Sequence, residues 1–279
     1  MHSLYCKGKQ LDLNRPLIMG IVNVTPDSFS DGGDYNSLDR AFLHAKHLAE
    51  EGADILDIGG ESTRPGASEV SAEIEIERVI PLIQLLANLD VPISIDTSKP
   101  EVMLAAVNAG ASIINDVFAL RRPGALNAAV ESGANICIMH MLGEPRTMQI
   151  NPHYNDVTAE VIQFLKTRIQ TLESAGCNQN RILLDPGFGF GKNLRHNLTL
   201  LHDLDKIAAL GYPLLVGLSR KSMLGVISGR QDPAARIYAS IAAALISVQN
   251  GAHIVRVHDV AATRDALKVW EALNKDQEQ

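Results

Sequence analysis

The chain has 279 residues, of which 46% are hydrophobic and 20% are charged, and its formal net charge is −7. The length fits one α/β barrel, so we expect a single domain over residues 1–279, and the acidic balance argues against nucleic acid or an anionic membrane surface as a partner. No apolar run reaches the roughly 18 residues that a membrane-spanning helix needs.

The cysteines and the first residues indicate a reducing compartment. Cys6, Cys137 and Cys177 are widely spaced and form no CxxC motif, so neither a disulfide framework nor a zinc site is expected. The start, Met-His-Ser-Leu-Tyr-Cys-Lys, does not have the composition of a signal peptide. We therefore expect a cytoplasmic protein.

The first part of the chain predicts a hairpin and then a buried strand. Residues 3–13 alternate apolar and polar around Lys7-Gly8-Lys9, which is typical of a short hairpin. The apolar run 17–23 ends in Asn23 and leads into a polar loop with Phe29 at its centre. A buried strand that delivers a polar amide to such a loop often begins an active site, and the alternative is an ordinary surface turn.

A repeated pattern follows, in which a helix ends at a glycine and a short β-branched run comes next. These runs are apolar on both faces, as parallel strands covered by helices must be. The eight predicted strands, each followed by a helical segment, are 17–23, 54–58, 92–96, 112–115, 135–139, 181–185, 213–217 and 252–257.

Two helix starts are well marked. Ser98 with Glu101 predicts a capping box with Pro100 in the first turn, and Asp232 before Pro233 predicts an N-cap. Consecutive βα units predict a closed (β/α)8 TIM barrel, with the short N-terminal hairpin covering its bottom. An open doubly wound sheet is the alternative, which the lack of a nucleotide fingerprint disfavours.

In such a barrel the functional site lies at the carboxyl ends of the strands. Each predicted strand delivers polar residues to that end. They are Asn23, Asp57 with Glu61, Thr63 and Arg64, Asp96, Asn115 with Asp116, His140, Asp185, Ser219 with Arg220 and Lys221, and Arg256 with His258. One polar strand end is often a helix cap, but so many at one edge indicate a binding rim.

The residue types in the rim indicate its ligand. Four cationic side chains on an acidic protein predict an anionic substrate, a phosphate or diphosphate. A carboxylate accepts two parallel N–H bonds, so Asp185 or Asp96 fits the edge of an amino-pyrimidinone ring. Asn23 is a poor lone metal ligand but fits the shell of a Mg²⁺ held mainly by substrate phosphates. The four cations are Arg64, Lys221, Arg256 and His258.

The segment 185–192, Asp-Pro-Gly-Phe-Gly-Phe-Gly-Lys, is not a P-loop, because only three residues separate its outer glycines and Asn follows its Lys. We expect a turn in which glycines let the backbone approach a ligand and Phe188 or Phe190 supplies an apolar wall. No Ser-His-Asp or Cys-His set stands out, so acyl transfer is not expected.

Taken together, these stretches closely resemble the dihydropteroate synthase family of bacteria. The matching motifs span nearly the whole chain in the family's order and are jointly specific. They are Gly20-Ile-Val-Asn-Val-Thr-Pro-Asp-Ser-Phe-Ser-Asp-Gly-Gly33, Asp57-Ile-Gly-Gly-Glu-Ser-Thr-Arg-Pro-Gly66, Ile95-Asp-Thr97, Ile114-Asn-Asp116, 185–192, Gly217-Leu-Ser-Arg-Lys-Ser222 and Arg256-Val-His-Asp259.

The resemblance implies a reaction and its small-molecule substrates. In it, 4-aminobenzoate displaces diphosphate from 7,8-dihydropterin-6-ylmethyl diphosphate to give 7,8-dihydropteroate for folate synthesis, with Mg²⁺ as cofactor. An arylamine is a weak nucleophile and Mg²⁺-diphosphate is a good leaving group, so we expect bond breaking ahead of attack.

The resemblance also implies roles for individual residues. The pterin would be held by Asp96, Asn115, Asp185 and Lys221, with Met139 and Phe190 near its faces. The diphosphate would be held by Asn23, Thr63, Arg64, Arg256 and His258, with Asn23 as the metal ligand. The aminobenzoate pocket, where sulfonamides bind in this family, would be bordered by Phe29, Thr63, Pro65, Ser219 and Lys221. Catalysis would rest on Asp96, Lys221, Arg64 and Asn23, and residues 24–36 and 61–72 would be mobile loops.

The sequence departs from the family pattern in three places, none of which removes a proposed ligand contact. They are Phe118-Ala119, Leu142 and Ala239. Two alternatives remain, a pterin- or folate-binding methyltransferase barrel and a non-catalytic pterin-binding paralogue. The signature at 25–33 and 62–65 argues against the first, and the presence of Asn23, Arg64 and Lys221 argues against the second.

Residues 237–248 are apolar nearly all round. An outer helix of a barrel needs only one apolar face, so we expect the other face to be buried in a homodimer, as the resemblance also implies. The alternative is a helix buried on both faces within one chain.

Overall fold

Eight parallel strands form the centre of the computed structural model, which describes residues 3–24, 34–62, 69–144 and 147–275. The hydrogen-bonded order is β8-β7-β6-β5-β4-β3-β10-β9, and a parallel bridge between Leu184 and Leu214 joins the two ends. The strands are β3 (Leu17–Asn23), β4 (Ile55–Gly59), β5 (Ile93–Asp96), β6 (Ile113–Asp116), β7 (Asn135–Met139), β8 (Ile182–Asp185), β9 (Leu215–Val216) and β10 (Ile254–Val257).

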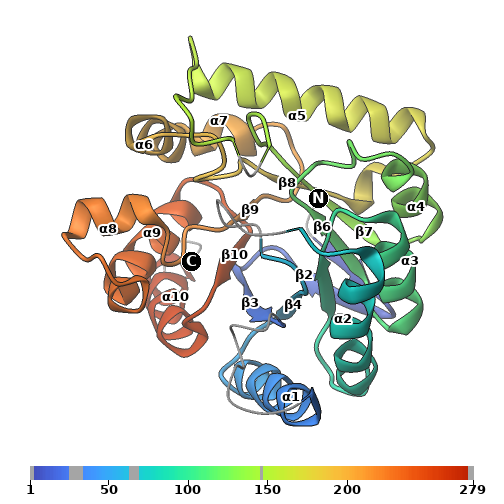
Figure 1. Ribbon diagram of the computed structural model, residues 1–279. Helices are drawn as coiled ribbons and strands as arrows, with labels where there is room; N and C mark the ends of the chain where they lie inside the picture. The colour runs from blue at the N-terminus through green and yellow to red at the C-terminus, as the bar shows by residue number, and fades with distance from the viewer. Residues whose placement is uncertain (1–2, 25–33, 63–68, 145–146, 276–279) are drawn as a thin grey trace.

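Helices surround these strands on the outside (Figure 1). They are α1 (Asp34–Glu50), α2 (Ala72–Leu86), α3 (Pro100–Ala109), α4 (Ala125–Glu131), α5 (Val157–Ser174), α6 (Leu194–His202), α7 (Leu204–Ala208), α8 (Ser222–Ser228), α9 (Ile237–Gln249) and α10 (Val260–Lys275), with short 3₁₀ turns at η2 (Gln179–Arg181) and η3 (Pro233–Arg236). The predicted (β/α)8 barrel is confirmed, and the open doubly wound sheet is wrong. Within the described residues, no helix has the length and apolar character to cross a membrane.

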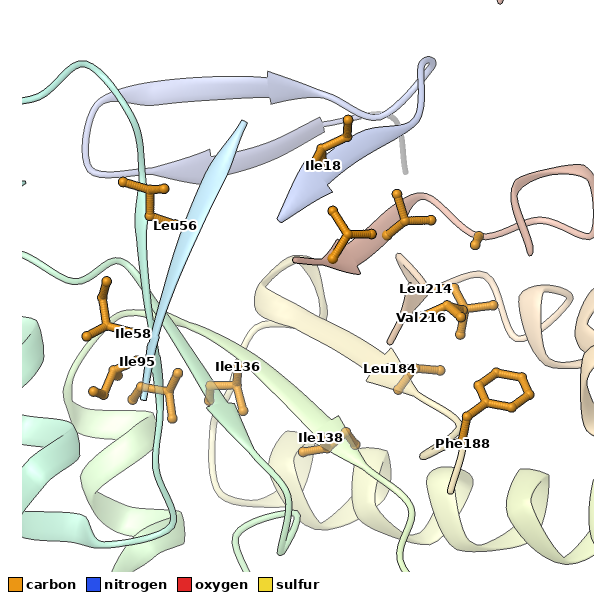
Figure 2. Close-up of a cluster of buried hydrophobic side chains, with 14 of the residues drawn as sticks. Ile18, Leu56, Ile58, Ile95, Ile136, Ile138, Leu184, Phe188, Leu214 and Val216 are labelled. Atoms are coloured by element: carbon orange, nitrogen blue, oxygen red, sulfur yellow. The ribbon is translucent and has the colours of Figure 1, made fainter. Parts of the chain in front are cut away.

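Alternation along the strands separates two apolar layers. Outward side chains such as Ile18, Leu56 and Ile136 pack against the helices in the main core, part of which Figure 2 shows. Inward side chains such as Leu17 and Ile113 form a second cluster inside the barrel. Each strand is therefore buried on both faces, which is why its sequence is apolar without strict alternation.

The hairpin of β1 (Ser3–Cys6) and β2 (Lys9–Asp12) covers the amino ends of the strands. Its Leu4 and Cys6 are fully or almost fully buried in the inner cluster. The side-chain amide of Asn135, the first residue of β7, donates to the carbonyl of Tyr5 at 2.7 Å. The predicted hairpin and its place at the bottom of the barrel are confirmed.

One partly buried carboxylate links several elements at the bottom of the barrel. Asp54 accepts hydrogen bonds from the Ile18 backbone N–H at 2.8 Å and from Arg15 Nη2 at 2.7 Å, and it pairs with Arg264 on α10. These contacts link β3, the start of β4 and the last helix. They lie at the end of the barrel opposite the strands' carboxyl ends, so a substitution at Asp54 can serve as a control that is remote from those ends.

Both predicted helix starts are found, with Pro100 in the first turn of α3 as expected, but the capping box predicted there is wrong. Asp232 accepts the Ala234 backbone N–H at 2.9 Å, although the turn it begins is the 3₁₀ segment η3 that runs into α9. At α3 the N-cap is Lys99, which makes no side-chain cap, so Ser98 forms no capping box. The Thr97 hydroxyl accepts the Lys99 N–H at 3.3 Å and shapes this turn instead.

Candidate active site

The inward positions of the strands change from apolar to polar toward their carboxyl ends. On β6, Ile113 lies in the inner apolar cluster, whereas Asn115 two residues later bonds to an inward carboxylate. On β8, Leu183 precedes Asp185 in the same way. Side chains two residues apart on a strand share one face, so the apolar barrel interior ends in a polar floor.

One guanidinium joins two carboxylates of this floor. Arg256 on β10 donates from Nε to Asp57 Oδ2 at 2.6 Å and from Nη2 to Asp96 Oδ2 at 2.9 Å. Asn115 Nδ2 donates to the same Asp57 oxygen at 3.3 Å. The structure thus brings together Asp57, Asp96, Asn115 and Arg256 of the predicted rim, and Asp57 is fully buried.

Because one guanidinium is shared by two carboxylates, this cluster has an excess of acidic groups. Burial raises the pKa of Asp96 to about 7, with Arg256 opposing the rise and Asp57 adding to it. For Arg256, burial would lower the pKa, but Asp57 and Asp96 raise it above its ordinary value. The guanidinium therefore stays charged, while Asp96 takes up a proton near neutral pH.

A second group of predicted residues lies around Asp185. Its Oδ1 accepts the Gly187 backbone N–H at 2.7 Å, and no donor in the described part of the chain bonds its Oδ2. Burial raises the pKa of Asp185, and Lys221 and the Gly187 N–H oppose that rise. Burial lowers the pKa of Lys221 to about 8, with Asp185 opposing the fall. The Oδ2 atom is thus an acceptor with its orientation already set.

Apolar side chains flank this carboxylate. Lys221 Nζ lies 4.6 Å from the centre of the Phe190 ring and also donates to the Phe188 carbonyl. Met139, the register partner of Asp185, belongs to an apolar cluster against which Phe190 and Phe118 pack. Phe118, one of the departures from the family pattern, therefore adds to this wall, and Met139 and Phe190, both predicted near the faces of the pterin, lie in the same cluster.

Two glycines of the 185–192 turn lie against a neighbouring segment of the chain. A Cβ at Gly191 would lie 2.7 Å from the Leu142 carbonyl oxygen, and a Cβ at Gly187 would collide with the His140 carbonyl. Both residues have positive φ, which also favours glycine. The Cβ direction at both glycines is filled by the chain's own 140–142 segment, and this close approach accounts for glycine at these positions. Phe188 is fully buried in the core.

Ser219 and His258 adjoin each other at the ends of β9 and β10. Ser219 Oγ lies 3.0 Å from His258 Nδ1 and accepts the His258 backbone N–H at 3.2 Å. The predicted aminobenzoate and diphosphate regions therefore share a border. The predicted residues Phe29, Thr63, Arg64 and Pro65 lie outside the described residues.

Two polar strand ends turn away from the floor. Asp116 accepts the backbone N–H groups of Phe118 at 2.8 Å and Leu120 at 2.7 Å, and burial raises its pKa to about 6. His140 contacts Lys192 and the Phe164 ring behind the sheet. Both residues follow an inward residue directly, so strand alternation would have excluded them from the rim.

Asn23 is the candidate metal ligand of this floor. It ends β3 beside Gly59 of β4 and offers one neutral amide oxygen. Among the residues that the structure describes, no three His, Cys, Asp or Glu side chains form a metal cluster. A single amide fits a Mg²⁺ that brings phosphate and water ligands with it, and does not fit an ion held by the protein alone.

The comparisons with known proteins agree with this geometry. A family model described as pterin binding enzyme matches residues 19–258. The dihydropteroate synthase of Escherichia coli K12 is 53% identical over 270 residues, which cover 96% of this chain and 95% of the relative. The chain belongs to the dihydropteroate synthase family. The prediction from sequence is confirmed, and with it the prediction of a transferase enzyme.

Two solved structures of dihydropteroate synthases extend the similarity to three dimensions. The Xanthomonas albilineans enzyme with 4-aminobenzoic acid is 54% identical with a TM-score of 0.93, and covers 98% of both chains. The Burkholderia cenocepacia enzyme complexed with 7,8-dihydropteroate is 50% identical with a TM-score of 0.91, and covers 99% of this chain and 98% of its own. The relatives over nearly the full length are dihydropteroate synthases, which favours this family over the methyltransferase barrel.

The raised pKa of Asp96 predicts a pH dependence of pterin binding. The edge of a pterin ring offers N–H donors. An ionised carboxylate accepts hydrogen bonds from these groups more strongly than a protonated carboxylic acid does. Affinity for the pterin should therefore rise from about pH 5.5 to about pH 7.5, by up to roughly tenfold per pH unit below the pKa. Calorimetry should show this rise in the wild type and a flattened profile in Asp96→Asn. An equally steep profile in the variant would remove Asp96 from the titration.

Proposed function

We propose that this chain joins 4-aminobenzoate to 7,8-dihydropterin-6-ylmethyl diphosphate, releasing diphosphate and forming 7,8-dihydropteroate. The family membership supports the reaction, as do the 4-aminobenzoic acid and 7,8-dihydropteroate complexes of the relatives. The observation that carries the proposal for this chain is the Asp185 carboxylate. One of its oxygens is fixed by the Gly187 N–H and the other is open beside Lys221.

The pterin is proposed to bind between the two groups of the floor. Asp185 Oδ2 would accept from the amino-pyrimidinone edge, and a bond from N–H to a carboxylate is stronger than one between neutral groups. Asp96, Asn115 and Lys221 would bond the remaining polar atoms of the ring, and Met139 and Phe190 would contact its faces. These side chains are already fixed in place, either by the strands or by the turn at 185–192.

The diphosphate is proposed to lie above the floor. Arg256 uses Nε and Nη2 for Asp57 and Asp96, which leaves Nη1 for the phosphate oxygens. His258, two residues after Arg256, would also contact the phosphate oxygens. Asn23 would bind the Mg²⁺ that accompanies the phosphates, and Thr63 and Arg64 join this set on the match to the family motif.

The aminobenzoate is proposed to bind at the border formed by Ser219 and Lys221. Ser219 is tied to His258, so this pocket lies beside the diphosphate group. Phe29, Thr63 and Pro65 are assigned to the same pocket from the family motifs. The nucleophile and the leaving group would then lie next to each other at the pterin methylene carbon.

The proposed mechanism breaks the carbon–oxygen bond ahead of attack. The arylamine lone pair is delocalised into its ring, which makes it a weak nucleophile, and the methylene carbon can share positive charge with the pterin ring. When bound, Mg²⁺ neutralises charge on the departing diphosphate. Arg64, Lys221 and Arg256 would stabilise the same charge, and Asp96 would offset the positive charge that develops on the pterin.

The proposed order needs no strong general base. The arylamine nitrogen becomes acidic once it is bonded to carbon, so its proton can pass to water. His140 is not available for this task, because burial and Lys192 lower its pKa to about 2 and its Nδ1 contacts Lys192. The chain's own contribution is to orient the pterin and to stabilise charge on both sides of the breaking bond.

Replacing Asp185 tests the pterin site. Asp185→Asn keeps an oxygen for the Gly187 N–H but places an NH₂ group against the pterin donors, so pterin affinity should fall by about 2 kcal/mol or more, roughly 30-fold. Calorimetry measures this loss. Asp54→Asn alters a carboxylate at the bottom of the barrel, and should lower the melting temperature without changing pterin affinity. Unchanged affinity in Asp185→Asn would remove this residue from the site.

A homodimer through the last helices is also proposed. Exposed apolar side chains on the neighbouring helices α8, α9 and α10 include Val226 (66% exposed), Tyr238 (76%) and Val269 (64%). The inner face of α9 is made of small residues such as Ala243 and Ala244, which pack on the barrel. A group of exposed apolar side chains on one side of a monomer is typical of a protein–protein interface.

Light scattering should therefore give a mass of twice 30.2 kDa. Tyr238→Glu places a charge in the proposed interface and should shift the mass toward the monomer. Leu43→Glu, at an exposed position on α1, should not, and is the matched control. A monomer mass for the wild type at micromolar concentration contradicts the proposal.

A cytoplasmic location is proposed on the state of the cysteines. Cys6, Cys137 and Cys177 are all buried free thiols. A reducing compartment preserves such thiols, which supports the location expected from the sequence.

A further inference from the structure

Lys192 is a buried amine behind the polar floor, and the proposed chemistry gives it no task. It is 2% exposed. Its Nζ donates to the Gly187 carbonyl at 2.8 Å and to the Phe190 carbonyl at 3.1 Å, and lies 2.9 Å from His140 Nδ1. Burial lowers the pKa of Lys192 well below its ordinary value. A neutral amine still has two N–H donors, so the bonds to both carbonyls form whether or not Lys192 is charged.

His140 is the third partner of Lys192. Its Nδ1 accepts a hydrogen bond from an ammonium group or donates one to a neutral amine, so the contact forms in either protonation state of Lys192. Burial and the charge of Lys192 lower the pKa of His140, which agrees with a neutral ring. The ring packs edge-on against Phe164 with centres 4.9 Å apart, and the backbone N–H donates to the Asp185 carbonyl at 3.0 Å.

Side chains hold the other carbonyls of the same turn. The Gly191 carbonyl accepts the Tyr154 hydroxyl at 2.9 Å, and the Lys192 carbonyl accepts Asn197 Nδ2 at 3.2 Å. Lys221 donates to the Phe188 carbonyl, and Gln149 donates to the Gly189 carbonyl. Every carbonyl from 187 to 192 therefore accepts a hydrogen bond from a side chain.

Lys192 differs from the other donors in how many points of the turn it bonds. It bonds the turn at two points, directly before and after the Phe188-Gly189 pair, and attaches both to β7 through His140. When charged, Lys192 also opposes the rise in the pKa of Asp185. Burying an amine is costly unless it is hydrogen-bonded, so a turn that needed only packing would be served by an apolar side chain.

We propose that Lys192 is a positioning residue for the pterin. By joining Gly187, Phe190 and His140 from behind, it fixes the Gly187 N–H that orients Asp185 and the segment that carries the Phe190 ring before any ligand arrives. The inference rests on the proposed function, because it takes Asp185 and Phe190 as pterin contacts.

The test compares Lys192→Met with a matched control at the other end of the same strand. Arg181 precedes β8 and donates to the Ala134 carbonyl at 2.8 Å and to the Val130 carbonyl at 3.3 Å, so it too holds backbone carbonyls with a basic side chain. Both Lys192→Met and Arg181→Met should lower the melting temperature. A purely structural role would predict the same pterin affinity for the two variants.

Positioning predicts a difference between them. Lys192→Met should raise both the Kd and the KM for the pterin substrate by about tenfold or more, whereas the KM for the aminobenzoate should change by less than about threefold. Arg181→Met should leave the pterin Kd within about twofold of the wild type. Lys192→Gln, which keeps two N–H donors, should fall between wild type and Lys192→Met, and it decides the question if Lys192→Met does not fold.

Different results would overturn the positioning role of Lys192 and the proposed function. If Asp185→Asn keeps its pterin affinity, the proposed site is wrong. If Asp185→Asn loses affinity while a folded Lys192→Met binds the pterin as the wild type does, the proposed site stands and the positioning role is overturned. Wild-type affinity in Lys192→Gln, when Lys192→Met is unfolded, overturns it as well.

Discussion

One guanidinium between the fully buried Asp57 carboxylate and the partly exposed Asp96 carboxylate is the interaction on which the rest of the site depends. Arg256 lies on β10, and its partners Asp57 and Asp96 lie on β4 and β5, on the far side of β3 in the sheet. The first pair joins residues 199 positions apart in the sequence. Breaking a buried pair typically costs about 3–5 kcal/mol, because a charge is left without a partner. The three strand ends therefore have to keep their relative positions.

This constraint explains why the floor can recognise a flat, polar ring. Side chains that project from strands are held more precisely than those on loops, and Asp96 and Asn115 are register partners on neighbouring strands. On the other side, the turn after β8 reaches similar rigidity without regular structure, because side chains bond each of its carbonyls. The proposed pterin site thus combines a rigid sheet with a turn that is held from behind.

Much of this arrangement could be predicted from the sequence. The eight strands follow from short apolar runs, and the clearest of these come after a glycine that ends a helix. Strand ends identify Asn115, Asp185 and Arg256 as rim residues. Counting every polar residue at a strand end assigns Asp116 and His140 to the rim, although both face away from it. Side-chain alternation along β6 and β7 would have excluded them, because each directly follows an inward residue. The role of Lys192 is hidden from local pattern, since its partner His140 is 52 residues away and only the fold brings them together.

The pterin site is complete in the free protein on this account, whereas the aminobenzoate pocket is completed by the bound diphosphate. Calorimetry of each component alone tests this most directly, with 6-hydroxymethyl-7,8-dihydropterin as the pterin that lacks diphosphate. It should bind the free enzyme with or without Mg²⁺, and 4-aminobenzoate should bind well only when diphosphate and Mg²⁺ are present. Equal aminobenzoate affinity in both conditions, or a pterin that binds only as its diphosphate with Mg²⁺, would contradict the account.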